Sequence, residues 1–150
     1  RSGQPCTGMI SAYHLGHEFT TDVLELRFGG ALTQDAGDAT WLSTLYALIE
    51  GASRELGIER DDLDGVLYPY QRGLPPALVL YDNVPGGAGH TQHIAESLER
   101  VAAAALAVVT NCECGEETSC YGCLRNYYNQ FAHDQLERRL ARDVLQRLMR

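Results

Sequence analysis

The sequence contains no lysine, and all twelve of its basic residues are arginines. A phosphate-binding loop of the GxxxxGK(S/T) type needs its lysine on the nucleotide phosphates. The chain by itself therefore cannot be a P-loop ATPase. Many restriction-type nucleases also pair carboxylates with a lysine, so the same absence disfavours that class.

Long apolar runs are missing as well, because no stretch approaches the roughly twenty apolar residues of a membrane span. The chain begins Arg1-Ser2-Gly3-Gln4-Pro5, with neither an initiator Met nor an apolar signal core. We therefore expect a piece of a longer cytoplasmic protein with no membrane partner. Its 150 residues suit a single domain, residues 1–150.

The net charge of −8 is unevenly distributed. Residues 1–124 carry six Arg and seventeen Asp or Glu, whereas residues 125–150 carry six Arg and three acids. The acidic body is a poor autonomous binder of nucleic acid, since binding there needs cations that neutralise phosphates. The basic tail is either a phosphate-binding patch or an ordinary solvated helix surface.

Four of the five cysteines, Cys112, Cys114, Cys120 and Cys123, form the pattern CxCx₅CxxC. Four thiolates make the tetrahedral shell that structural Zn²⁺ prefers, and a full shell leaves no position for substrate. The pattern predicts a structural zinc in a sub-region at 110–150. Disulfides and an iron–sulfur cluster stay open as alternatives. A reducing compartment favours metal and leaves Cys6 as a free thiol.

The apolar pattern predicts an α+β fold with a small, largely antiparallel sheet. Alternation over residues 20–28 indicates a half-buried strand, with residues 7–15 as its hairpin partner. A short strand is expected at 66–70, after an acidic turn at 61–64. The continuous apolar run at 77–81 is typical of a central strand covered on both faces.

Two long helices should cover this sheet. One runs from Asp38 to Leu56 with Gly57 as its C-terminal cap, and the other spans about residues 90–109. A final helix is expected from about His133 to Met149. The zinc knuckle and this last helix should pack together at one end.

A glycine-rich loop follows the central strand. Glycines Gly86, Gly87 and Gly89 would let backbone amides approach a phosphate at a helix N-terminus. The alternative is a tight strand-to-helix turn in which Asp82 and Asn83 are turn and cap residues. Without a lysine, the turn is the favoured interpretation.

Other candidate groups give weaker signals. The group His14, His17 and Glu18 fits an ordinary hairpin with exposed imidazoles better than a second metal site. We expect surface or capping roles for His90, His93 and His133, although His133 is placed to replace a cysteine ligand. A metal-dependent nuclease is a minor hypothesis, with candidate carboxylates Asp22, Glu25 and Asp82.

Aromatic residues cluster after the cysteines. Tyr121, Tyr127 and Tyr128 lie beside Arg125, as aromatics and arginine do in proteins that bind single strands. The competing interpretation, which we favour, has these rings packed around the zinc as a miniature core.

The motifs together resemble a known family. Their order along the chain resembles that of the zinc-binding C-terminal domain of MrfA-type DEAD/DEAH-box helicases, a superfamily-two group. The matching parts are the helix at 41–51, the glycine-loop stretch 80–89, the four cysteines and the run 119–127. A similar domain ends helicase-like phage-defence proteins such as the DrmB component of DISARM. The similarity covers nearly the whole chain from about Thr20.

The resemblance implies a non-catalytic accessory domain of a DNA helicase or translocase in DNA repair or phage defence, which assists nucleic-acid engagement or strand separation. The four cysteines map onto the family's metal ligands, while ATP and Mg²⁺ belong to motor domains elsewhere. Expected partners are those motor domains, DNA and a partner subunit. Candidate nucleic-acid contacts are Arg125, Tyr127, Arg138 and Arg142. The alternative, favoured by the acidic body, is a protein-interaction or interdomain clamp with no direct DNA contact.

Overall fold

The structure is a computed structural model that describes residues 16–29, 36–69, 71 and 74–150. The predicted hairpin partner at 7–15, which includes His14, and the predicted free thiol Cys6 lie outside the described residues. Within the described ranges, no helix combines the length and the apolar composition that a membrane crossing requires.

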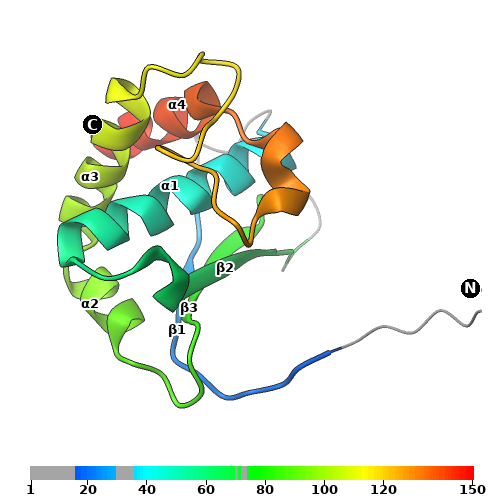
Figure 1. Cartoon of the computed structure of the whole chain (residues 1–150), viewed down its shortest axis with the longest axis vertical. Coiled ribbons are helices and arrows are strands. Elements are labelled where there is room, and N and C mark those ends of the chain that lie inside the picture. Colours follow the sequence, from blue (N-terminus) through cyan, green and yellow to red (C-terminus); the bar gives the residue numbers. More distant parts are fainter. Residues whose placement is uncertain (1–15, 30–35, 70, 72–73) are drawn as a thin grey trace, which may run out of the picture.

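A three-stranded antiparallel sheet forms the base of the molecule (Figure 1). Its strands are β1 (Val23–Leu26), β2 (Leu63–Tyr68) and β3 (Ala77–Asp82), in the order β1-β3-β2. The apolar run therefore occupies the centre, as predicted. Strand β2 begins at Leu63, after a 3₁₀ turn η2 (Arg60–Asp62), and so starts earlier than the sequence pattern indicated.

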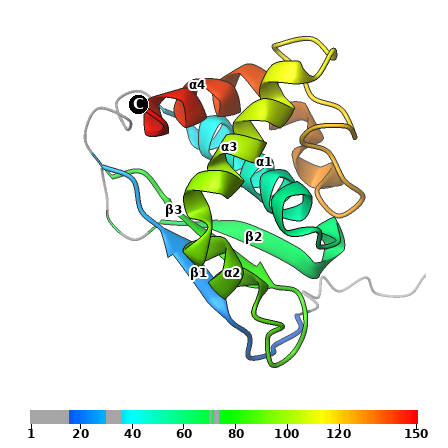
Figure 2. The same cartoon turned by 90° about the vertical axis from the view of Figure 1, so that its left-hand side faces the viewer.

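In the described part of the chain, helices cover only one face of the sheet (Figure 2). Leu78 and Leu80 are fully buried, whereas Val79 and Tyr81, which alternate with them, are partly exposed. Val66, the partner of Val79 in the sheet register, is 47% exposed. The prediction that β3 is covered on both faces is therefore wrong, since an apolar run does not reveal how many faces are covered.

Helix α1 (Asp38–Leu56) has the predicted bounds and lies between the sheet and the other long helices. It ends at Gly57, whose φ of 67° is a left-handed conformation and whose N–H donates to the Ser53 carbonyl. Helices α3 (Leu98–Asn111) and α4 (Arg138–Leu148) pack against α1 and against each other. The expected α+β architecture is thus confirmed.

Two predicted helices are each divided. The first is α2 (His90–Glu96) followed by α3, with Ser97 at φ −121° between them. The last consists of a 3₁₀ helix, η3 (Gln130–Gln135), and α4. Between these two the chain is extended, because the Glu137 amide donates to Ser43 Oγ at 3.0 Å on α1. Such a distant partner leaves no periodic trace in the sequence.

One hydrophobic core joins all of these elements. Trp41 and Leu45 of α1, Leu80 of β3, Leu124 of the cysteine region and Leu145 of α4 belong to the same buried cluster. The cysteine segment is therefore part of the domain and not an appendage.

The closest helix–helix approach predicts the effect of one substitution. A Cβ on Gly51 of α1 would lie 2.6 Å from the Val101 carbonyl oxygen and 2.7 Å from the Ala105 Cβ of α3. Gly51→Ala should lower the free energy of unfolding by about 1–3 kcal/mol through overpacking, despite a helix-propensity gain of roughly 1 kcal/mol. Denaturant unfolding measures this change.

The control is Gly37→Ser at the N-cap of α1, where an added Cβ meets open space. This variant should be as stable as the parent or slightly more stable, because serine caps helix N-termini. A stable Gly51→Ala variant would contradict the close packing of α1 on α3.

Candidate functional site

The end of α3 and the turn after it bring the four cysteines together. Cys112 caps α3, and its amide donates to the Val108 carbonyl at 3.2 Å. The other end of the group is a tight turn in which the amides of Cys123, Leu124 and Arg125 all donate to the Cys120 carbonyl. We call residues 112–125 the cysteine knuckle. Its four sulfur atoms all lie within 4.8 Å of one another.

The sulfur separations fit a single tetrahedral ion. Neighbouring Sγ atoms are 3.4 Å (Cys112–Cys114), 3.5 Å (Cys112–Cys120), 3.7 Å (Cys114–Cys123) and 3.9 Å (Cys120–Cys123) apart. Zinc–thiolate bonds of about 2.3 Å place tetrahedral sulfurs about 3.8 Å apart. A disulfide would hold two of them about 2.05 Å apart, and none is bonded. A cluster of several irons spreads its thiolates more widely than one ion does.

The surroundings lower the pKa of one knuckle thiol, Cys112, and raise the pKa of two others, Cys114 and Cys123. Burial raises the pKa of Cys123, the fully buried member. At Cys112, burial acts in the same direction, but hydrogen bonds from the Cys114 amide and neighbouring thiols lower the pKa to about 7. The amides of Cys120 and Gly122 also point at knuckle sulfurs, both at 3.3 Å. Donors of this kind orient metal ligands and stabilise thiolate charge.

A buried carboxylate on α1 anchors the turn of the knuckle. Glu50, whose side chain is 7% exposed, pairs with Arg54 Nε at 2.7 Å and Arg60 Nε at 2.5 Å. The Arg60 contact is an ion pair whose atoms are not aligned for a hydrogen bond. Both guanidinium groups then donate to the knuckle backbone: Arg54 to the Gly122 carbonyl at 3.1 Å, and Arg60 to the carbonyls of Tyr121 at 3.1 Å and Cys123 at 3.4 Å.

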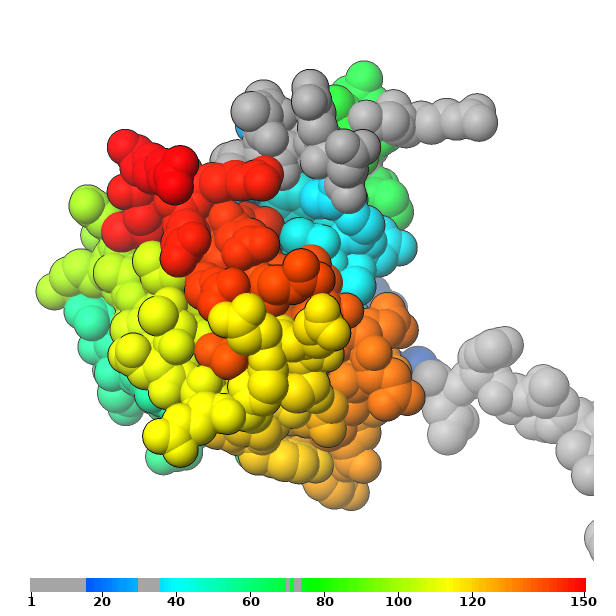
Figure 3. All heavy atoms as spheres, turned by 90° about the horizontal axis from the view of Figure 1, so that it is seen from above, coloured from blue at the N-terminus to red at the C-terminus, as the bar shows by residue number. Residues whose placement is uncertain are grey.

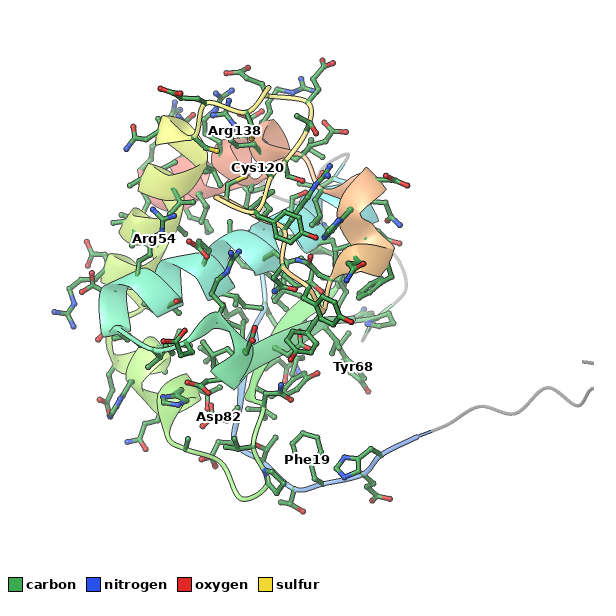
Figure 4. The ribbon with its side chains drawn as sticks, in the orientation of Figure 1. Phe19, Arg54, Tyr68, Asp82, Cys120 and Arg138 are labelled. Carbon is green, nitrogen blue, oxygen red and sulfur yellow. The ribbon has the colours of Figure 1, made fainter. Side chains whose placement is uncertain are left out.

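A third arginine, Arg138, holds the knuckle from α4. The guanidinium of Arg138 donates to the carbonyls of Val109 at 2.7 Å, Thr110 at 3.4 Å and Cys114 at 2.9 Å. Figure 4 shows Arg138 and Arg54 on different sides of the segment that carries Cys120. The first amides of α4 are satisfied in the same region, since Arg138 N donates to the Thr118 carbonyl at 3.0 Å.

These contacts decide which candidate arginines are free to meet DNA. Arg138 is only 7% exposed, so its guanidinium supports the knuckle and does not form an outer phosphate contact. Arg142 pairs with Glu116 at 2.5 Å, and its side chain is 21% exposed. Arg125 donates to Ser119 Oγ at 2.9 Å and to the His133 carbonyl at 3.3 Å. The structure thus brings three predicted arginines to the knuckle, where each already donates at least two hydrogen bonds within the domain.

The tyrosines lie on the outside. Tyr121, Tyr127 and Tyr128 are 61%, 74% and 58% exposed. The favoured prediction of a miniature aromatic core around the metal is therefore wrong, because Leu124 and the arginine–carbonyl contacts fill that role. Phe131, which the sequence analysis did not select, is 76% exposed on η3.

His133 does not replace a cysteine in the group of four ligands. Its Nε2 lies 3.1 Å from the Asn126 carbonyl and 2.9 Å from Asn129 Oδ1, and both of these atoms are acceptors. Nε2 therefore carries a proton and braces the loop. Its ring stands edge-on to Tyr121, with ring centroids 5.6 Å apart.

The glycine loop is organised by Asp82. This fully buried carboxylate accepts from the amides of Ala88 at 2.6 Å, His90 at 3.0 Å and Thr91 at 2.9 Å. Burial acts to raise its pKa, but the three amides outweigh that effect and lower it. Asp82 thus supplies internally the negative charge that an anion would bring, and the geometry is that of a strand-to-helix turn. Gly87, with φ 75°, leaves no room for a Cβ beside Asp22.

Carboxylates do not gather into a second metal site within the described residues. Among the nuclease candidates, Asp82 is used by the turn, and Glu25 pairs with Arg27 at 2.6 Å. Asp22 lies against the glycine loop. The imidazole of His17 is exposed, as predicted, and lies near Phe19.

Comparison with known proteins identifies the family. The model described as "MrfA Zn-binding domain" matches residues 44–124, more than half of the chain and all four cysteines. The chain belongs to the MrfA Zn-binding domain family. Druantia protein DruE of Escherichia coli (strain UMEA 4076-1) is 33% identical over 93% of this chain, which spans 8% of the length of DruE.

Solved structures share the fold. Two crystal structures of the helicase MrfA, one bound to DNA and one to DNA and AMPPNP, align with TM-scores of 0.51 and 0.60. Both are 20% identical to this chain, and the alignments cover 77% and 87% of it but only 15% and 16% of MrfA. Family membership and a four-sulfur geometry together support Zn²⁺ in this MrfA Zn-binding domain, where it would cross-link the knuckle and supply no reaction chemistry.

Removing a ligand should release the metal. Cys120→Ser and Cys123→Ser are expected to lose stoichiometric zinc in elemental analysis, because an alcohol is a poor zinc ligand at neutral pH. Zinc affinity should also fall as pH falls, since protons compete for the thiolates. The control Cys6→Ser should retain its metal. Iron with visible absorbance in the purified chain would contradict the zinc assignment.

The Glu50 contacts predict a second effect. Glu50→Gln removes the charge between Arg54 and Arg60 and should cost about 2 kcal/mol of unfolding free energy, less than a fully buried pair because Arg54 is 53% exposed. Zinc release to a chelator should also be faster. The matched control is Glu55→Gln on the same helix, whose partner Arg100 is 68% exposed, with an expected cost below about 1 kcal/mol. Equal losses in both variants would refute the anchoring role.

Proposed function

We propose that this chain is a non-catalytic, zinc-stabilised accessory domain of a cytoplasmic DNA helicase or translocase in DNA repair or phage defence. It assists the engagement of nucleic acid or the separation of strands. ATP hydrolysis with Mg²⁺ belongs to motor domains of the longer protein, and those domains are its immediate partners. The DNA in the two MrfA structures supports DNA as a further partner.

The observation that carries the proposal is that the segment around the last two cysteines holds no acidic residue and exposes aromatic rings. Twenty of the 150 residues are acidic, yet none lies between Glu117 and Asp134. This segment contains half of the cysteine knuckle and continues into η3. A phosphate backbone meets no like charge from the segment itself, whereas residues 1–117, with six Arg and seventeen acids, repel it.

The second candidate is a protein-interaction or interdomain clamp, which other surfaces favour. The open face of the sheet exposes Val23 at 62%, Val66 at 47% and Tyr68 at 55%. A cleft of about 670 Å³ between β1, α3 and the end of α4 is mostly apolar, with Leu26, Phe28, Leu98 and Leu148 in its wall. Surfaces of this kind suit a neighbouring domain.

Binding measurements on the zinc-loaded chain separate the two functions. Fluorescence anisotropy with labelled single-stranded and duplex DNA should show binding to at least one of them at low ionic strength. Metal chelation should weaken this binding, because the segment 118–133 depends on the knuckle. If a folded, zinc-loaded chain binds neither single-stranded nor duplex DNA at any salt concentration, the proposal is refuted. The protein-interaction or interdomain clamp would then be the favoured function.

A further inference from the structure

Four aromatic rings in the knuckle and the segment after it are left outside the hydrophobic core. Tyr121, Tyr127, Tyr128 and Phe131 are 61%, 74%, 58% and 76% exposed and lie within eleven residues of sequence. We call these four residues the aromatic face. Figure 3 shows the knuckle loop and η3 as one continuous surface. Exposed apolar groups in such a cluster mark a binding surface, because the fold gains little from them.

The backbone beneath these rings is tightly fixed. Asn126 and Asn129 bond reciprocally: the Asn126 amide donates to Asn129 Oδ1 at 2.8 Å, and the Asn129 amide donates to Asn126 Oδ1 at 2.8 Å. The side chain of Asn129, fully buried, also donates to the Leu124 carbonyl at 2.8 Å. A loop that is ordered in advance loses little conformational entropy when a ligand binds.

The rings themselves are also placed by neighbours. Tyr127 and Tyr128 stand perpendicular, with centroids 5.5 Å apart, and Tyr121 stands edge-on to His133. Neither pair is stacked face to face, so each perpendicular contact covers at most one face of one of its two rings. They remain available to flat partners.

We propose that the aromatic face stacks the unpaired bases of single-stranded nucleic acid. This inference rests on the proposed function and names its substrate class. Every base has a π-face, so stacking on tyrosine and phenylalanine binds a single strand without sequence preference. A duplex keeps its base faces inside the helix and cannot offer them to these rings.

The charges around the aromatic face indicate stacking in preference to phosphate contact. Arg125, Arg138 and Arg142, the nearby candidate cations, donate to Ser119, to backbone carbonyls and to Glu116. A surface that neutralises few phosphates releases few counterions, so its affinity changes little with salt. The expected slope of log affinity against log salt is therefore shallow, about −1 or smaller in magnitude.

The experiment titrates the zinc-loaded chain into labelled oligothymidine and into a duplex of the same length at several salt concentrations. The unsubstituted chain should prefer the single strand. Tyr127→Ala and Phe131→Ala should each weaken single-strand binding by about fivefold or more, and Tyr127→Trp should restore it because an indole also stacks. The control is Phe19→Ala, a comparable ring loss at the opposite end of the molecule in Figure 4.

Equal affinity for both DNAs, with no change in the alanine variants, would overturn this inference and leave the proposed function standing. A steep salt dependence that Tyr127→Ala leaves unchanged would overturn it in the same way. Absence of binding to either DNA by the unsubstituted chain would overturn the inference and the proposed function together. Zinc content and melting temperature of each variant, compared with Phe19→Ala, show whether a loss of affinity comes from unfolding.

Discussion

The position of the cysteine knuckle depends on the charge of Glu50. A carboxylate that is 7% exposed is costly to bury alone, by several kcal/mol, unless cations pair with it. Arg54 and Arg60 provide that pairing, and the same guanidinium groups reach the knuckle carbonyls of Tyr121, Gly122 and Cys123. The ion pairs with Glu50 therefore orient the guanidinium groups of Arg54 and Arg60. Their hydrogen bonds then fix the turn that carries Cys120 and Cys123 relative to α1.

Arg138 of α4 also holds the knuckle, so the knuckle is fixed to α4 as well as to α1. Arg138 links the end of α3, the Cys114 carbonyl and the start of α4. A bound Zn²⁺ would cross-link the same loop through the four cysteine thiolates, and a full sulfur shell would leave no position for substrate. Any binding function must therefore come from the side chains that the knuckle and the residues after it expose. Because Arg125 and Arg138 donate to groups of the domain itself, the exposed surface of residues 118–133 is largely aromatic and carries no carboxylate, in a chain whose net charge is −8.

Sequence patterns predicted the features that depend on local chemistry. The spacing of the cysteines and the bounds of α1 are set by neighbours along the chain. The central position of β3 was predicted from the burial that a continuous apolar run implies. Long-range partners were not predictable. The helical pattern gives no sign that Glu50 is buried. Arg60 lies 63 residues along the chain from Cys123, whose carbonyl it contacts. Likewise, the helical pattern around Arg138 does not show that the end of α3 lies against it, and the tyrosines that pattern suggested for a core are outside it.

The central claim is that the metal and the arginine contacts together hold the segment that carries the aromatic face against α1, α3 and α4. Hydrogen–deuterium exchange before and after zinc removal tests this claim most directly. The account predicts that chelation increases exchange from Cys112 to Arg138 and in the last turn of α1, while the amides of β3 and the first half of α1 keep their protection. Unchanged exchange across Tyr121–Phe131 after verified zinc removal would contradict it.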